Sequence, residues 1–167
     1  AVIYAGNLVA TVRPIAGAVG ASVSGIDLRD DLTPDVIDGI EALLADRGVV
    51  VFVDQDLTPE DHRRVASAFG PLRPPPEYVH NLEDDGLPEI AKLSTEDYGK
   101  MADHWHSDVT WAEAPPRYSV LHMRHASREG GDTMWASQIE GYRHLSETMQ
   151  AFTRTLDAVH SLGPKLR

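Results

Sequence analysis

The run Val49–Val53 constrains the fold of this chain most strongly. It places five apolar residues in a row, four of them valine, directly after Gly48. A run of this length and β-branched content is typical of a strand buried on both faces. Helix-start signals lie on both sides of it: Thr33-Pro34 upstream, in a helix that Gly48 closes, and Thr58-Pro59-Glu60-Asp61 downstream. Asp61 is placed to complete a capping box in the second helix.

Further short strands are expected along the chain. Residues 8–15 and 19–26 predict strand, turn and strand, and four later strands are expected at 90–93, 118–123, 132–135 and 156–160. Residues 137–155 have helical patterning, with Ser146 a suitable N-cap for the second half. Many short strands with a few helices favour a β-sandwich or jelly roll flanked by helices over alternating βαβ units. We expect residues 1–167 to form a single domain.

Composition and charge exclude several classes of function. The net charge of −11 argues against nucleic acid or an anionic membrane surface as a partner. The absence of cysteine excludes zinc–thiolate sites, iron–sulfur clusters and a thiol nucleophile. No secretion signal is visible and no stretch approaches the length of a membrane span, so a cytoplasmic location is the expectation.

Residues 71–89 are predicted to form a long surface loop. They contain five prolines and an acidic Glu83-Asp84-Asp85-Gly86 patch. Loops of this length inside a compact domain are usually functional or mobile, which indicates a mobile active-site loop.

The most informative polar motif is His106-Ser107-Asp108. On an extended strand, residues two apart leave the same face, so His106 and Asp108 can supply two legs of a 2-His-1-carboxylate iron site. The spacing alone is weak, since with 8 histidines in the chain about one such spacing arises by chance, and a polar surface turn is the alternative. The third ligand must be a histidine from elsewhere.

The order of several motifs resembles the taurine dioxygenase (TauD/TfdA) family of Fe(II)- and 2-oxoglutarate-dependent oxygenases. The resemblance rests on Trp105-His106-Ser107-Asp108-Val109-Thr110, Pro115-Pro116 and Gly130-Gly131-Asp132-Thr133-Met134-Trp135, and on the earlier segments 17–28, 49–52 and 69–72. It implies a mainly β fold with flanking helices, a double-stranded β-helix (jelly roll) that is incomplete in this chain.

The resemblance also implies roles for individual residues. His106 and Asp108 would be metal ligands, and the Thr133 hydroxyl would bind the distal carboxylate of 2-oxoglutarate. Trp135 and Tyr78 would lie near the substrate, although a core tryptophan and an ordinary loop tyrosine are the alternatives for these two.

Two departures from the taurine enzyme bear on the substrate. A histidine that holds the sulfonate there corresponds to Pro75 here, and an asparagine before the iron motif corresponds to about Ala102. Both changes remove hydrogen-bond donors and argue against taurine itself. A different sulfonate, an alkyl sulfate or another small acid is the expected substrate, with dioxygen as the second partner. A homo-oligomer is compatible with this interpretation of the chain as an oxygenase.

The resemblance also exposes a difference in length. Family members continue well beyond the equivalent of Arg167, and the distal iron-binding histidine and the arginine that pairs with 2-oxoglutarate lie in that part. We therefore interpret the chain as the N-terminal portion of an enzyme that hydroxylates a small acid while 2-oxoglutarate is decarboxylated to succinate. One alternative is a truncated, non-catalytic jelly-roll module for binding or oligomerisation. A weaker one is a cupin-like protein that uses another metal.

Overall fold

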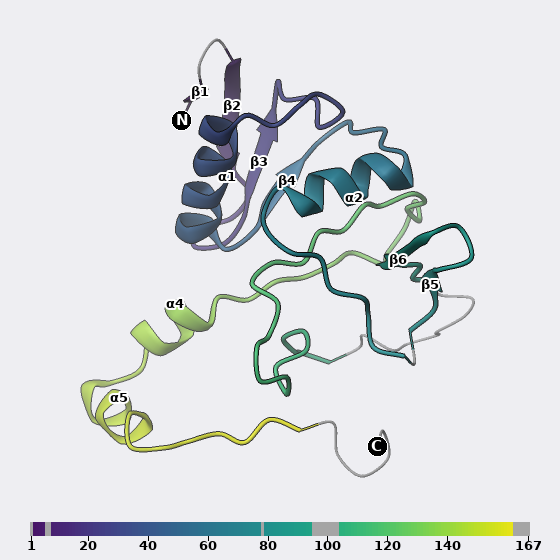
Figure 1. Ribbon diagram of the computed structural model, residues 1–167. Helices are drawn as coiled ribbons and strands as arrows, with labels where there is room; N and C mark the ends of the chain where they lie inside the picture. The colour runs from purple at the N-terminus through teal and green to yellow at the C-terminus, as the bar shows by residue number, and fades with distance from the viewer. Residues whose placement is uncertain (1, 6–7, 78, 95–103, 162–167) are drawn as a thin grey trace. The chain divides into compact units, whose positions relative to one another are not determined.

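The structure is a computed structural model of residues 1–167. It describes the whole chain except residues 1, 6–7, 78, 95–103 and 162–167. Figure 1 shows the chain with its helices and strands labelled. By its internal contacts the chain divides into two compact units. The first unit contains residues 1–57 and 123–156, and the second contains residues 58–122 and 157–167.

A four-stranded sheet forms the framework of the first unit, in the order β1-β2-β3-β4. Its first three strands, β1 (Val2–Ala5), β2 (Leu8–Pro14) and β3 (Ala21–Ser24), pair antiparallel. β4 (Val50–Phe52) pairs parallel with β3, with Val23 opposite Phe52. The strand–turn–strand prediction for residues 8–26 is confirmed.

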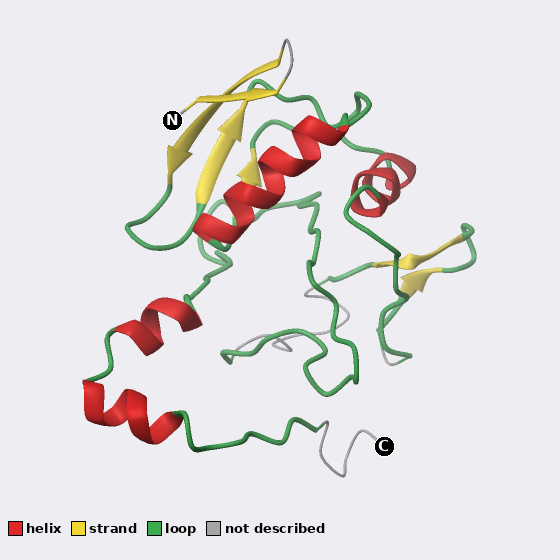
Figure 2. Ribbon diagram, turned by 60° about the vertical axis from the view of Figure 1, so that its left-hand side comes forward, coloured by secondary structure: helices red, strands yellow, loops and turns green. Residues whose placement is uncertain are grey.

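Helix α1 (Pro34–Arg47) makes the crossover that a parallel β3–β4 pair requires. Pro34 stands in its first turn, and Gly48 ends it with φ +70° and an N–H donated to the Leu44 carbonyl at 2.8 Å. Only glycine adopts this backbone conformation at low cost, which is why the helix stops there. Figure 2 shows α1 lying along the sheet.

The core of the first unit lies between this helix and the sheet. Its members are apolar side chains of the strands, of the loop after β3 and of one helix face, each at most 7% exposed: Ala10, Val12, Ala21, Val23, Ile26, Leu28, Val36 and Ile40. Burial of this apolar area is what holds α1 on the sheet.

The prediction that residues 49–53 are buried on both faces is wrong. All three residues of β4 are half-buried, and Val53 is 38% exposed. The reason is position: among the described residues, β4 is the last strand of its sheet and pairs with β3 alone, so its side chains are covered only in part. The apolar run correctly predicted a strand but not its place at an edge.

Helix α2 (Pro59–Ser67) opens the second unit with the predicted capping box. The Thr58 hydroxyl accepts from the Asp61 N–H at 3.1 Å, and the Asp61 carboxylate accepts from the Thr58 N–H at 3.1 Å. Val65 is the buried residue of this helix. Arg63 pairs with Glu89 at 3.2 Å and ties α2 to the hairpin beside it.

That hairpin consists of β5 (Asn81–Leu82) and β6 (Leu87–Ala91), paired antiparallel around a turn at Gly86. The strand expected at 90–93 is therefore present but begins earlier. Its partner strand lies inside residues 71–89, so the expectation of a loop throughout that range is wrong from residue 81 onward. Mobility of the remainder stays a prediction.

Three other expected strands do not form. Residues 118–123, 132–135 and 156–160 are described, and the structure assigns no strand to them. A β-strand is completed by a neighbour that satisfies its backbone N–H and C=O groups, and β-propensity does not supply that neighbour.

The helical region 137–155 is present as two helices, α4 (Gln138–Arg143) and α5 (Glu147–Thr153). Ser146 caps α5 as predicted, accepting from the Met149 N–H at 3.3 Å. The Gln150 side-chain amide donates to the Tyr142 carbonyl at 3.2 Å and the Leu145 carbonyl at 3.1 Å, which closes the C-terminal end of α4. Neither helix has a buried residue, and the hydrogen bonds of Gln150 join α5 to α4.

Among the described residues, no helix has both the length and the apolar character needed to cross a membrane.

Candidate metal centre

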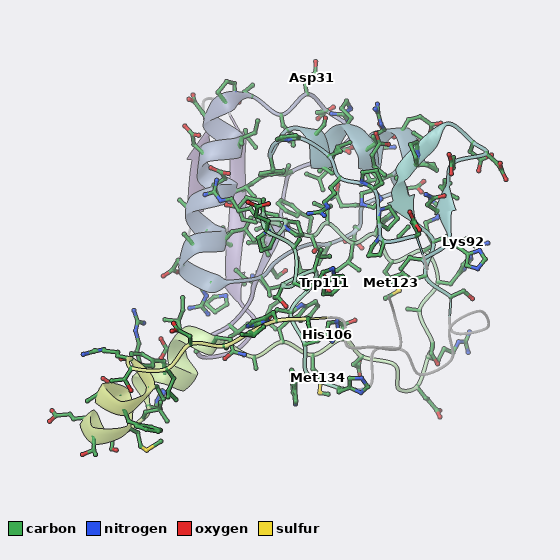
Figure 3. All side chains as sticks on the ribbon, turned by 60° about the horizontal axis from the view of Figure 1, so that its bottom comes forward. Asp31, Lys92, His106, Trp111, Met123 and Met134 are labelled. Atoms are coloured by element: carbon green, nitrogen blue, oxygen red, sulfur yellow. The ribbon has the colours of Figure 1, made fainter. Side chains whose placement is uncertain are left out.

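The His106–Asp108 segment lies in a loop of the second unit and not on a strand. A turn begins at Asp108, and the Ala112 N–H donates to the Val109 carbonyl at 3.1 Å. His106 and Trp111 of this segment are labelled in Figure 3. The segment is thus the turn that the sequence left open as an alternative to an extended strand, and this turn brings the two predicted ligands together.

The His106 Nε2 and the Asp108 Oδ1 lie 3.4 Å apart. The other ring nitrogen of His106, Nδ1, lies 2.9 Å from the His104 carbonyl oxygen. A carbonyl only accepts, so this contact places a hydrogen on Nδ1 and, in the neutral ring, a lone pair on Nε2. A lone pair and a carboxylate oxygen that face each other form a donor set a divalent cation can bridge. A backbone carbonyl behind the ring is the usual support of a metal-binding histidine.

Stability does not account for this pair. The two side chains are 53% and 56% exposed. Exposed ion pairs contribute about 0–1 kcal/mol, and this one requires a protonated imidazole to count at all. The two side chains thus offer a metal ion two donor atoms, while as an ion pair they contribute little to stability.

Further contacts fix the loop around the pair. Asp108 Oδ2 accepts from the Ser119 hydroxyl at 3.0 Å. Two residues beyond Asp108, the Thr110 hydroxyl lies 2.8 Å from His160 Nδ1. Sequence reasoning missed Ser119, because a serine eleven residues away carries no spacing signal until the loop folds.

Val109 has a strained backbone. Its φ is +52°, in the left-handed region where a β-branched residue is rarely found. Such strain costs about 1–3 kcal/mol and concentrates at functional sites. It lies between the candidate ligand Asp108 and the anchored Thr110, so the turn geometry at the site is maintained against a local cost.

Two further histidines of the second unit lie together. His62 and His122 have ring centroids 6.1 Å apart in an edge-to-face arrangement, and His62 Nε2 lies 3.0 Å from the Val120 carbonyl. Burial lowers the pKa of His62, the Val120 contact opposes this, and the nearby His122 lowers it further. Within the described residues, no three His, Cys, Asp or Glu side chains form a group able to hold a metal. The third ligand is therefore not placed.

The other predicted site residues are placed differently. Thr133 and Trp135 belong to the first unit and are exposed, Trp135 by 47%, so their roles remain predictions. Tyr78 and Ala102 lie outside the described residues. Pro75 is half-buried in the stretch between α2 and β5.

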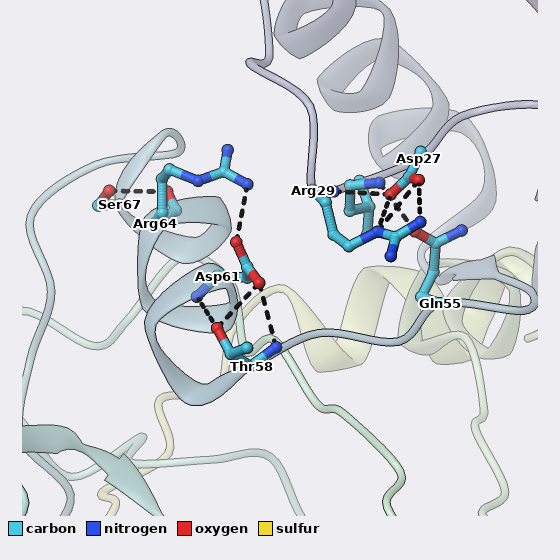
Figure 4. Close-up of polar contacts among 8 residues, drawn as sticks. Asp27, Arg29, Gln55, Thr58, Asp61, Arg64 and Ser67 are labelled. Atoms are coloured by element: carbon cyan, nitrogen blue, oxygen red, sulfur yellow. Dashed lines mark hydrogen bonds and ion pairs between the residues drawn. The ribbon is translucent and has the colours of Figure 1, made fainter.

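A pocket of about 300 Å³ lies elsewhere, at the carboxyl ends of β3 and β4. Two of the side chains that line it have partners. The Gln55 amide nitrogen donates to the Ile26 and Val53 carbonyls, each at 2.9 Å, and the Asp27 carboxylate accepts from Arg29 at 2.7 Å (Figure 4). Hydrogen bonds from Arg29 lower the pKa of Asp27 to about 2. None of the predicted site residues lines this pocket.

Together, the β-sheet scaffold and the loop-borne histidine–carboxylate pair define a candidate mononuclear metal protein. The model of the family "Taurine catabolism dioxygenase TauD, TfdA family" matches residues 11–167. The chain therefore belongs to the TauD/TfdA dioxygenase family.

Individual relatives agree with this assignment. The chain is 34% identical over 152 residues to an alpha-ketoglutarate-dependent sulfate ester dioxygenase of Pseudomonas putida, covering 90% of this chain and 49% of the relative. It is 33% identical to an alkylsulfatase of Acinetobacter baylyi, covering 90% of this chain and 46% of the relative. The chain spans about half the length of these curated relatives.

A solved structure gives the same picture. A crystal structure of a taurine dioxygenase from Burkholderia xenovorans superposes with a TM-score of 0.72 at 32% identity, over 94% of this chain and 55% of that one. The described architecture is thus that of TauD-type dioxygenases, sheets with a few helices, over the part that aligns.

Proposed function

We propose that this chain acts in the Fe(II)- and 2-oxoglutarate-dependent oxygenation of a small organic acid. The convergence of His106 Nε2 and Asp108 Oδ1 to 3.4 Å carries the proposal, because it joins the two residues that the family motif would use. Relatives named as alpha-ketoglutarate-dependent dioxygenases support the choice of co-substrate.

The chain's own residues have distinct roles in this proposal. His106 and Asp108 hold the metal, and the His104 carbonyl keeps the imidazole in the tautomer that binds it. Thr133 binds the distal carboxylate of 2-oxoglutarate, with Trp135 and Tyr78 near the substrate. When bound, Fe(II) with 2-oxoglutarate supplies the oxidation of a C–H bond, and the protein orients the substrate and excludes water. The stretch 71–80 closes over the substrate.

A sulfate ester is the favoured substrate class. Two similar relatives are named for sulfate esters and alkyl sulfates. Pro75 stands where the taurine enzyme has its sulfonate-holding histidine, which argues against taurine. Hydroxylation of the carbon next to the ester oxygen would let the product collapse to an aldehyde and sulfate.

The proposed fold is part of a double-stranded β-helix. Three segments have the composition of strands, but the structure assigns no strand to them: 118–123, 132–135 and 156–160. Strands from outside the given sequence would complete their backbone ladders; this chain covers 55% of a solved structure that aligns with it.

The central test compares Asp108→Ala with Asp84→Ala. Asp84 is an exposed aspartate in the turn of the β5–β6 hairpin and provides the same substitution away from the site. Each protein is incubated with Fe(II), ascorbate, 2-oxoglutarate and a panel of sulfate esters, sulfonates and aryloxy acids, and succinate is measured. We expect substrate-dependent succinate release, lost in Asp108→Ala and kept in Asp84→Ala.

A second outcome distinguishes the alternative function. The second candidate is a non-catalytic binding module, because within the described residues no third His, Cys, Asp or Glu joins His106 and Asp108 in a metal-holding group. Metal binding that depends on Asp108, without succinate release on any substrate, would identify such a module. Succinate release that is unchanged in Asp108→Ala would refute the proposed site.

A further inference from the structure

We propose that Ser119 is a positioning residue for the Asp108 carboxylate; the proposal rests on the metal-binding role given to Asp108 above. The Ser119 hydroxyl donates to Asp108 Oδ2 at 3.0 Å, while the other oxygen, Oδ1, faces His106 Nε2 at 3.4 Å. The two carboxylate oxygens therefore have different partners.

This division of the carboxylate has a chemical consequence. An aspartate side chain rotates about its terminal bond, so a free carboxylate presents either oxygen or both to a cation. A hydroxyl holding Oδ2 removes that freedom and directs Oδ1 alone toward the imidazole. Hydrogen bonds of this kind to ligating carboxylates orient them and tune metal affinity. Asp108 is 56% exposed, so packing does not supply this restraint.

Ser119 is itself held in place from both sides. The following residue, Val120, has its carbonyl 3.0 Å from His62 Nε2 of α2. The preceding residue, Tyr118, packs edge-to-face against Phe69, with ring centroids 6.0 Å apart. These contacts fix the backbone at Ser119 although no strand forms there, so the hydroxyl is anchored to α2 and to the residues that follow it.

The competing explanation is that the hydroxyl only stabilises the loop. Three variants separate the two. Ser119→Ala removes the hydroxyl, Ser119→Thr keeps it, and Ser127→Ala removes an exposed loop hydroxyl that bonds the Glu129 carbonyl at 2.8 Å. Mn(II) affinity is measured on the full chain from the electron paramagnetic resonance signal of free Mn(II), together with the thermal midpoint.

We expect Ser119→Ala to weaken Mn(II) binding by about 10- to 100-fold, the usual effect of removing a partner of a metal ligand. Ser119→Thr and Ser127→Ala should bind within about threefold of the unmodified chain, and the midpoint should stay within about 2 °C in all of them. If Ser119→Ala also lowers the thermal midpoint, Ser119→Thr decides the question. Mn(II) affinity close to that of the unmodified chain in Ser119→Thr supports the proposal, and weakened Mn(II) affinity in Ser119→Thr overturns it.

Asp108→Ala separates failure of this inference from failure of the proposed function. If Mn(II) binding is lost in Asp108→Ala but unchanged in Ser119→Ala, the positioning role is refuted and the metal site stands. If the unmodified chain does not bind Mn(II) at millimolar concentration, or Asp108→Ala binds equally well, the metal site itself is refuted and the role of Ser119 with it.

Discussion

Replacement of Val23 by alanine tests whether the sheet and α1 form the core of the first unit. Val23 is 1% exposed, is the largest fully buried side chain among the described residues, and lies in β3 between Val12 of β2 and Phe52 of β4. The substitution removes two methyl-sized groups, a transfer loss of about 1.6 kcal/mol at about 0.8 kcal/mol each. Backbone ladders on both sides of β3 limit collapse into the space, so the cavity raises the expected total to about 2–3 kcal/mol.

Val159→Ala is the matched control, because the same two groups are removed from a side chain that is 95% exposed. Urea unfolding of both variants is followed by far-ultraviolet circular dichroism. With a denaturant slope of about 2 kcal/mol/M, the Val23→Ala midpoint should fall by about 1–1.5 M. Val159→Ala should change the free energy of unfolding by less than about 0.5 kcal/mol. Equal losses in the two variants, or a loss below about 0.5 kcal/mol for Val23→Ala, would refute this description of the core.

Two other predictions concern α2, which anchors the loop behind the candidate metal centre. Thr58→Ala removes the N-cap hydroxyl of the capping box (Figure 4) and should lower the free energy of unfolding by about 1 kcal/mol in urea titrations, and an unchanged midpoint would contradict the cap. The pKa of His62 is lowered from 6.5 mainly by burial, so the unfolded chain binds its proton more readily. The free energy of unfolding therefore has its full His62 contribution above about pH 6.5. As the pH falls below that value, the unfolded chain takes up the proton first and this contribution is lost. His62→Gln should lose less stability than the unmodified chain between pH 7.5 and pH 5.5, and an identical loss in both proteins would show that His62 is not responsible.

Helix ends were the features that sequence reasoning predicted best. Thr58 with Asp61, Ser146 at the start of α5 and Gly48 at the end of α1 all act as expected. Each of these signals involves partners within about four residues along the chain. Their geometry follows from local backbone sterics and hydrogen bonding, which do not depend on distant segments.

Strands were predicted less well because pairing is not local. The runs that form strands in the first unit have neighbours in the sheet, whereas 118–123, 132–135 and 156–160 have similar composition and form none. The half-burial of β4 has the same origin. A run of valines predicts an extended segment, but its place in the sheet depends on which segments pack beside it.

At the candidate metal centre, the contributions of the sequence and of the tertiary structure can also be separated. The sequence by itself determined the identity and spacing of His106 and Asp108, and through the order of its motifs it indicated the family. Only the tertiary structure decided that a turn, not a strand, brings Nε2 and Oδ1 within 3.4 Å, and that the His104 carbonyl and the Ser119 hydroxyl hold their other atoms. The physical reason is that a hydrogen bond requires two groups to meet in space, and a serine eleven residues away meets Asp108 only once the chain between them has folded.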